Sequence, residues 1–224
     1  GLFTAPGSFA LTEELVVLGR TLEAEGARYF THLRDEGNTI YDSIGETLEF
    51  AEAVGVHVQI VHMKLSGIDN WGGARKVLQI LSDARDRGVN IDCDVYPYTA
   101  ASNPLRNLMP SWLQEGGIEG TLARLSSPGD RVRLRRAVDD DGLNNFGRIP
   151  SWASVRISIS PNLPHNAGRT IADIAEERGI DGFDMALDLI AEDRGQTRVL
   201  VESISEDDVQ DFVRSTDVMV GSDG

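Results

Sequence analysis

Helix-like and strand-like patterns alternate along the first hundred residues. Strand-like runs at residues 27–33, 56–63 and 89–98 each follow a helical segment that ends at a glycine, at positions 26, 55 and 88. Each helical segment places its apolar residues on one face. The face of the first segment contains Leu15, Leu18 and Leu22, that of the second Ile44, Leu48 and Ala51, and that of the third Val77, Leu78, Leu81 and Ala84. Such alternation predicts βαβ units and a parallel sheet, but periodicity does not distinguish an open sheet from a closed barrel.

The pattern loosens after residue 98 and divides the chain into three predicted parts. Residues 1–98 form the βα units, residues 99–153 form an insertion that is either lid-like or simply solvated, and residues 154–224 return to the sheet. In this last part we expect strands at 155–160 and 218–221, helices at 170–178 and 181–193, and a last helix in which Ser205 and Asp208 form a start resembling a capping box.

Composition and charge narrow the possible partners. The formal net charge of −15 argues against binding to nucleic acid or to an anionic membrane, both of which require a basic surface. The single cysteine, Cys93, excludes an intrachain disulfide and is compatible with the cytoplasm, where we expect the protein to be located. Neither a bilayer-spanning apolar run nor a glycine-rich nucleotide-binding fingerprint is present in the sequence.

Polar residues stand where the predicted strands end. His32, His62 and Tyr96 end the first three strands and Asp223 follows the last one. A single histidine at such a position is more often a structural residue, but parallel neighbouring strands bring two histidines to the same edge. Neutral imidazoles bind zinc without cancelling its charge, and a nearby carboxylate can take a proton from the water that zinc activates. The spacing therefore indicates a hydrolytic metal site, with structural histidines as the alternative.

Five segments occur here in an order that resembles a known family. They are residues 1–2 with 6–10 (PGSFA), 29–37 (YFTHLRDEG), 59–67 (QIVHMKLSG), 94–98 (DVYPY) and 220–224 (VGSDG). Together they resemble the N-acyl-D-amino-acid deacylases, or D-aminoacylases, of the amidohydrolase superfamily. The segments cover most of the first hundred residues and the extreme C-terminus, whereas residues 100–216 match only loosely.

The resemblance implies a TIM-like (β/α) barrel that holds one or two zinc ions. It implies that His32 and His62, on the fifth and sixth strands, are zinc ligands, and that Asp223, on the eighth, is a ligand or the general base. Lys64 and Tyr96 would bind the substrate's α-carboxylate, although a solvated lysine and a packed tyrosine are the structural alternatives.

The remaining charged residues, histidines and cysteine of interest are not expected to be metal ligands. Arg34 and Glu36 could form a buried ion pair in the loop after His32 or an equally plausible solvated pair. His57 begins its strand and should lie at the opposite edge, and His165 lies in a loop, so neither is expected to bind metal. Cys93 should be a small core residue rather than the metal-bridging cysteine of the family.

The chain also departs from the family's pattern. It contains no His-x-His pair, which the family carries on its first strands. We therefore expect an incomplete barrel, with an insertion before its last strand, that is weakly active or inactive by itself.

Three functions remain open from the sequence. The leading hypothesis is zinc-dependent hydrolysis of N-acyl-D-amino acids, a small-molecule substrate, to a carboxylate and a free D-amino acid. The alternatives are a hydrolase of cyclic amides, similar to hydantoinase or dihydroorotase, and a metal-free segment that binds a basic partner through its net charge of −15. The oligomeric state is not indicated by the sequence.

Overall fold

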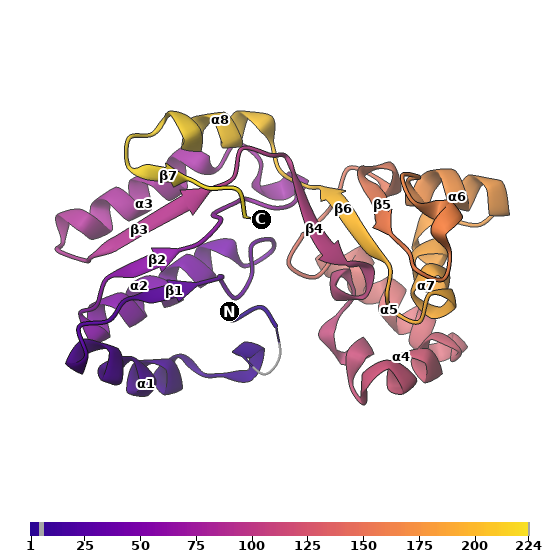
Figure 1. Cartoon of the computed structure of the whole chain (residues 1–224), viewed down its shortest axis with the longest axis horizontal. Coiled ribbons are helices and arrows are strands. Elements are labelled where there is room, and N and C mark those ends of the chain that lie inside the picture. The colour runs from indigo at the N-terminus through magenta and orange to yellow at the C-terminus, as the bar shows by residue number, and fades with distance from the viewer. Residues whose placement is uncertain (5–6, 224) are drawn as a thin grey trace. The chain divides into compact units, whose positions relative to one another are not determined.

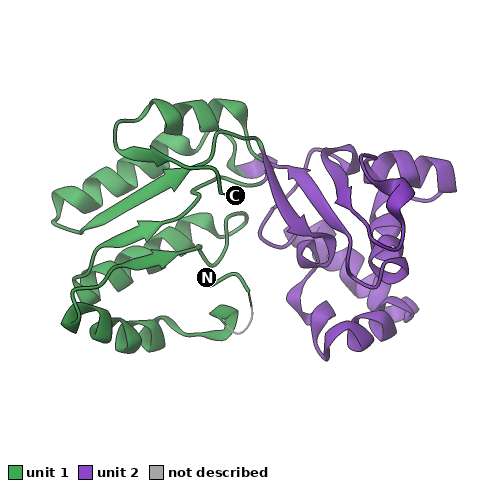
Figure 2. Cartoon of the chain, in the orientation of Figure 1, with its two compact units in different colours: residues 1–66, 70–99, 204–224 green, residues 67–69, 100–203 purple. Residues whose placement is uncertain are grey.

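The computed structural model describes residues 1–4 and 7–223 and divides into two compact units. Unit 1 contains residues 1–66, 70–99 and 204–224, and unit 2 contains residues 67–69 and 100–203 (Figure 2). Pro6 and Gly224, which belong to the matched segments, lie outside the described residues.

Unit 1 is an α/β structure with four parallel strands. The strands β1 (Tyr29–Thr31), β2 (Val58–Ile60), β3 (Ile91–Val95) and β7 (Val218–Val220) lie in the order β1-β2-β3-β7 (Figure 1). Four helices connect or precede them, namely α1 (Thr12–Ala24), α2 (Ile40–Val54), α3 (Ala74–Asp86) and α8 (Glu206–Arg214). The predicted parallel βαβ arrangement is confirmed for these elements.

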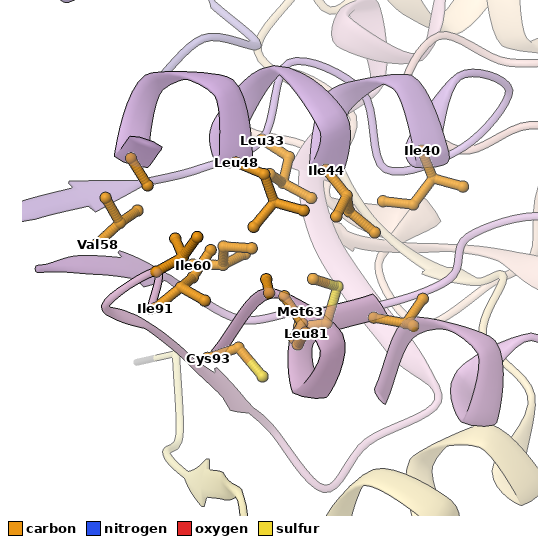
Figure 3. Close-up of a cluster of buried hydrophobic side chains, with 14 of the residues drawn as sticks. Leu33, Ile40, Ile44, Leu48, Val58, Ile60, Met63, Leu81, Ile91 and Cys93 are labelled. Atoms are coloured by element: carbon orange, nitrogen blue, oxygen red, sulfur yellow. The ribbon is translucent and has the colours of Figure 1, made fainter. Parts of the chain in front are cut away.

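One face of this sheet forms the core of unit 1. Val58, Ile60, Ile91 and Cys93 are at most 1% exposed and pack against the apolar faces of the helices, as Figure 3 shows for Ile44 and its neighbours on α2. The helical periodicity seen in the sequence matches the pattern of burial on α2 and α3. On α1 the predicted face is only partly confirmed, because Leu15 and Leu22 are partly buried against the core whereas Leu18 is 62% exposed. A large aliphatic side chain contributes about 1.5–3 kcal/mol when it leaves water.

The opposite face of the sheet has a different composition. Phe30 pairs in register with Gln59, and Asp94 pairs with Met219, so these four residues belong to the other side of the pleat. Phe30 is 62% exposed and Met219 is 50% exposed. Large apolar side chains on this face therefore remain in contact with solvent within unit 1.

Unit 2 is built on a separate, antiparallel sheet. Its strands β4 (Ala100–Pro104), β6 (Arg198–Glu202) and β5 (Val155–Ile159) lie in the order β4-β6-β5. They are accompanied by α4 (Gly117–Leu125), α5 (Pro128–Asp141), α6 (Ile171–Arg178) and α7 (Gly182–Glu192).

The boundaries of unit 2 differ from the predicted parts of the chain. The sequence pattern predicts a return to the parallel sheet at residue 154, whereas the chain returns to unit 1 at residue 204. The reason is strand pairing: β5 pairs antiparallel with β6 and not with a strand of unit 1. A strand pattern shows that a segment is extended but does not show which partner it pairs with.

The capping box expected at the start of α8 is wrong. Ser205 makes no side-chain hydrogen bond at this helix start. Asp208, which is 1% exposed, instead accepts hydrogen bonds from the backbone N–H groups of Gly72 and Ala74, at 2.8 and 2.9 Å. Its carboxylate therefore caps the N-terminus of α3, where backbone donors lack helical partners, and ties α8 to α3.

The remaining regular elements are short 3-10 turns. They are η1 (Gly7–Phe9), η2 (Ile68–Asn70), η3 (Leu105–Leu108), η4 (Ser111–Gln114), η5 (Trp152–Ser154) and η6 (Pro164–Asn166). Within residues 1–4 and 7–223, every helix is too short or too polar to cross a bilayer.

Candidate metal centre

Four of the predicted site residues follow strands of the parallel sheet at its carboxyl edge. His32 comes directly after β1, His62 two residues after β2, Tyr96 directly after β3 and Asp223 three residues after β7. Functional side chains of parallel α/β proteins gather at this edge because all strands end there. The structure thus places these four residues along one edge of unit 1.

The two imidazoles lie side by side. The ring centroids of His32 and His62 are 4.6 Å apart, and the rings are inclined at 78°. Nδ1 of His32 is 2.8 Å from the carbonyl oxygen of Leu33. A carbonyl oxygen only accepts hydrogen bonds, so Nδ1 carries the proton and the Nε2 lone pair of a neutral His32 is free for a metal ion.

Glu36 joins the two histidines. His32, Glu36 and His62 each offer a ligand atom, and these atoms lie within 4.8 Å of one another. Glu36 Oε1 is 3.1 Å from His62 Nδ1, and Glu36 Oε2 is 3.7 Å from His32 Nε2. Neutral imidazoles are ligands that zinc prefers, and the neighbouring carboxylate can serve as a further donor or as the acceptor for an imidazole N–H, so the residues present fit this ion. Asp223, although described, is not part of this close group.

Lys64 is buried beside this group. Its Nζ is 2.6 Å from Glu36 Oε1 and 2.7 Å from His62 Nδ1, and only 5% of its side chain is exposed. Burial by itself raises the pKa of Glu36, but the Lys64 ammonium and the two histidines hold that pKa well below its usual range. Glu36 is therefore a carboxylate in the folded protein, paired with a buried cation.

Burial has the opposite effect on the first imidazole. It lowers the pKa of His32, and the positive charge of Lys64 acts in the same direction against the opposing carboxylate of Glu36. The result favours neutral His32 near pH 7, which is the form that binds metal ions.

Asp94 fixes the backbone at His62. Its Oδ1 accepts the His62 backbone N–H at 2.7 Å, and its Oδ2 accepts a hydrogen bond from Gln59 Nε2 at 2.7 Å. His62 has a φ of +42°, a left-handed conformation that is uncommon for residues other than glycine. Non-glycine residues in this conformation cluster at functional sites, where the surrounding structure holds them in place.

The loops that carry the site are joined by further hydrogen bonds. Ser66 N donates to Glu36 O at 2.9 Å, and Asn70 Nδ2 donates to the carbonyl oxygens of Gly37 and Ser66, both at 2.8 Å. These hydrogen bonds hold the loop after β1 against the loop after β2. Glu36 and Lys64 are therefore in contact although 28 residues separate them in the sequence.

Tyr96 and Asp223 lie further along the same edge. Tyr96 is 3% exposed, its ring lies 5.2 Å from Lys64 Nζ, and its hydroxyl has no hydrogen-bond partner among the described residues. Burial raises the pKa of Tyr96, and the negative charges of Glu36 and Asp223 raise it further, so the phenol remains a hydrogen-bond donor. Asp223, like His62, has a left-handed backbone, with a φ of +53°.

The predicted pairing of Arg34 with Glu36 is wrong. Arg34 donates from Nε and Nη2 to the two carboxylate oxygens of Glu46, at 2.9 and 2.7 Å. Glu36 pairs with Lys64 instead. In the sequence, the feature that indicates a place for Glu36 in the site is its position four residues after His32. For Lys64 the corresponding feature is its position two residues after His62. Asp94 was within a matched segment, but nothing in its spacing indicated a contact with a backbone N–H.

The histidine and cysteine excluded by the sequence analysis lie away from the group. His57 precedes β2, at the other end of the strand from His62, and its Nε2 is 2.9 Å from Asp92 Oδ2. Cys93 is fully buried in the core of unit 1, as predicted, and burial raises the pKa of its thiol to about 12, which disfavours the thiolate form. His165 lies in η6 of unit 2.

Comparison with known proteins identifies the fold. No family model matches the chain. Over its whole length it superposes on a crystal structure of D-aminoacylase, described as defining a novel subset of amidohydrolases, with a TM-score of 0.69 and 26% identity. An N-acyl-D-glutamate deacylase from Bordetella bronchiseptica, complexed with zinc and a phosphonate inhibitor, superposes with a TM-score of 0.72 at 24% identity. Each alignment covers 38% of the longer protein. The chain therefore has an amidohydrolase fold.

The sequence relationship is more specific. The chain is 30% identical to the D-aminoacylase of Alcaligenes xylosoxydans xylosoxydans over 225 aligned positions, which span the whole chain and 37% of that protein. Its sequence is therefore similar to those of the N-acyl-D-amino-acid deacylases, and the resemblance predicted from its motifs is confirmed.

Proposed function

We propose that the protein carrying this chain is a zinc-dependent amidohydrolase that cleaves N-acyl-D-amino acids to a carboxylate and a free D-amino acid. The observation that carries this proposal is the group of His32, Glu36 and His62, whose ligand atoms lie within 4.8 Å of one another. The relative from Bordetella is a complex with zinc and with a phosphonate inhibitor that mimics the reaction's tetrahedral intermediate. We propose the same metal, as one or two ions, for this site.

We also propose that unit 1 is part of a TIM-like barrel. Its strands are parallel, and the helices contribute to a core on one face of the sheet. The exposed Phe30 and Met219 on the other face are the residues that a barrel interior would bury. The chain spans 37% of the length of the D-aminoacylase that it matches.

In the proposed mechanism, His32 and His62 would hold the zinc ion through ring nitrogens. A bound zinc ion supplies an acidified water and polarises the amide carbonyl. Asp223 takes a proton from the attacking water and delivers it to the leaving nitrogen, which departs as the free amine. Its position at the same carboxyl edge and its strained backbone support this role.

Lys64 and Tyr96 are proposed to bind the α-carboxylate of the substrate. An ammonium has three donors, and its hydrogen bond to Glu36 leaves donors available for an anion. The Tyr96 hydroxyl is a buried donor without a partner among the described residues, and a substrate carboxylate would satisfy it.

A substrate panel tests the proposed activity. We expect the purified full-length protein to hydrolyse N-acetyl-D-amino acids, to act much more slowly on the L-enantiomers, and to leave hydantoins and dihydropyrimidines intact. Cleavage of ring amides in place of linear ones would favour the cyclic-amide alternative. If every amide remains intact while a basic partner is bound, the interaction-module hypothesis is favoured.

Replacement of Tyr96 by phenylalanine tests the carboxylate site. A hydrogen bond to a charged group is worth about 1.5–3 kcal/mol, so KM should rise about 10- to 100-fold. The free energy of unfolding should not fall, because the hydroxyl has no partner to lose. Tyr98→Phe is the matched control, since Tyr98 stacks on Tyr96 at 5.5 Å but is 49% exposed. Equal KM values for both variants would contradict the assignment.

The remaining proposals concern location and partners. We propose a cytoplasmic protein with a small-molecule substrate and without nucleic-acid or membrane partners. The single cysteine and the net charge of −15 support this proposal.

A further inference from the structure

Glu36 lies at the centre of the site, although no step of the proposed reaction uses it. Its side chain is 4% exposed and contacts both candidate zinc ligands and Lys64. A buried carboxylate of this kind is either itself a metal ligand or acts through the residues that it contacts. The contacts of Lys64 distinguish these two roles.

Lys64 presents a difficulty for zinc binding at His62. Its Nζ is 2.7 Å from His62 Nδ1, so the ammonium is placed to donate a hydrogen bond to that atom. In a neutral imidazole this donation would put the ring proton on Nε2, which then has no lone pair for a metal ion. The positive charge would also repel a divalent cation in a buried site, where screening by water is weak.

Glu36 removes both obstacles. Its Oε1 accepts from Lys64 Nζ at 2.6 Å and lies 3.1 Å from His62 Nδ1. Glu36 gives the Lys64 ammonium an acceptor other than Nδ1. A carboxylate accepts but does not donate, so with Lys64 donating to Glu36 a proton on Nδ1 would also be held by Glu36, and the Nε2 lone pair would be free. Metal-binding histidines commonly donate their other ring N–H to a carboxylate in this way, which fixes the tautomer and the ring orientation.

We propose that Glu36 is a positioning residue that makes His62 a zinc ligand by accepting its Nδ1 proton and by neutralising the adjacent Lys64. This inference rests on the proposed zinc site. In it, Glu36 affects zinc binding through His62 and Lys64 without binding the ion itself. The carboxylate at position 36 then offsets the lysine at position 64 in addition to holding the ring proton of His62.

The test is a set of zinc affinities measured by competition with a chromophoric chelator in the full-length protein. Glu36→Gln should weaken zinc binding about 10- to 100-fold, the usual effect of losing a carboxylate that orients a ligating histidine. Glu36→Gln combined with Lys64→Met should recover part of that affinity, because the opposing cation is gone although the ring proton of His62 has lost its carboxylate acceptor. Lys64→Met alone should bind zinc at least as tightly as the natural protein.

Glu46→Gln is the matched control. Glu46 is also a carboxylate paired with a cation, Arg34, in unit 1, but it is not part of the histidine group. The zinc affinity of Glu46→Gln should equal that of the natural protein.

A second readout is the two-bond ¹H–¹⁵N spectrum of the metal-free imidazoles. It should show the Nδ1–H tautomer of His62 in the natural protein and the loss of that tautomer in Glu36→Gln.

The outcomes separate this inference from the proposed function. Unchanged zinc affinity in Glu36→Gln would overturn the inference alone. Equally weak binding in the single and double variants would also overturn it, because Glu36 would then be a direct ligand. If the single variant does not fold, the double variant, which has no buried charge left unpaired, decides between the two roles. If His62→Ala keeps its zinc, the proposed site itself fails, whatever Glu36 does.

Discussion

Replacement of His62 by alanine is expected to remove the bound zinc and to lower kcat/KM by at least about 10³-fold, or about 4 kcal/mol of transition-state stabilisation. His62 lies 4.6 Å from His32, ring to ring, and contacts Glu36, so its loss leaves a site with too few ligands. The measurements are zinc content after dialysis and the rate of hydrolysis of an N-acetyl-D-amino acid.

Two further variants make this prediction specific. Alanine tolerates the left-handed backbone at His62 poorly, whereas asparagine tolerates it, so His62→Asn should lose zinc without the added strain. His57→Ala is the matched control, because His57 belongs to the same chain segment but precedes β2 and contacts Asp92. Retention of zinc by the His62 variants, or its equal loss from His57→Ala, would contradict the assignment.

The second large effect is expected for Asp223→Asn. Asparagine keeps the size of the side chain and adopts the left-handed conformation readily, so this change removes mainly the negative charge. A general base contributes about 10²- to 10⁴-fold, and kcat should fall by that factor. The effect should appear in single-turnover measurements, which report the chemical step.

Asp217→Asn is the control for this variant. Asp217 directly precedes β7 and Asp223 follows it, so the two aspartates stand at opposite ends of one strand. The activity of Asp217→Asn should remain close to that of the natural protein. A fall in kcat of less than about tenfold for Asp223→Asn would remove the general base from the proposed mechanism.

The parallel part of the fold was predictable because its pattern is local. Each helix of unit 1 has an apolar face with a spacing of three or four residues, and each strand that follows is short and apolar. The antiparallel sheet of unit 2 was not predicted. Pairing between Ala100 and Glu202 joins residues about one hundred positions apart, and no local pattern specifies such a partner.

The site was predictable to the extent that it depends on strand ends. His32 and His62 follow neighbouring parallel strands, and the structure brings their rings together. The role of Glu36 was missed because the sequence suggested Arg34 as its partner, whereas the fold of the loops pairs it with Lys64. The role of Asp94 was also missed. Its carboxylate accepts a hydrogen bond from the backbone N–H of His62, and residue spacing does not indicate such a contact.

Anomalous diffraction at the zinc absorption edge, from crystals of the full-length protein, tests the central claim most directly. We expect a peak within about 2.0–2.1 Å of the Nε2 atoms of both His32 and His62, with Glu36 facing the Nδ1 side of the His62 ring. A zinc peak bound by other residues, or the absence of zinc from an active protein, would contradict the account.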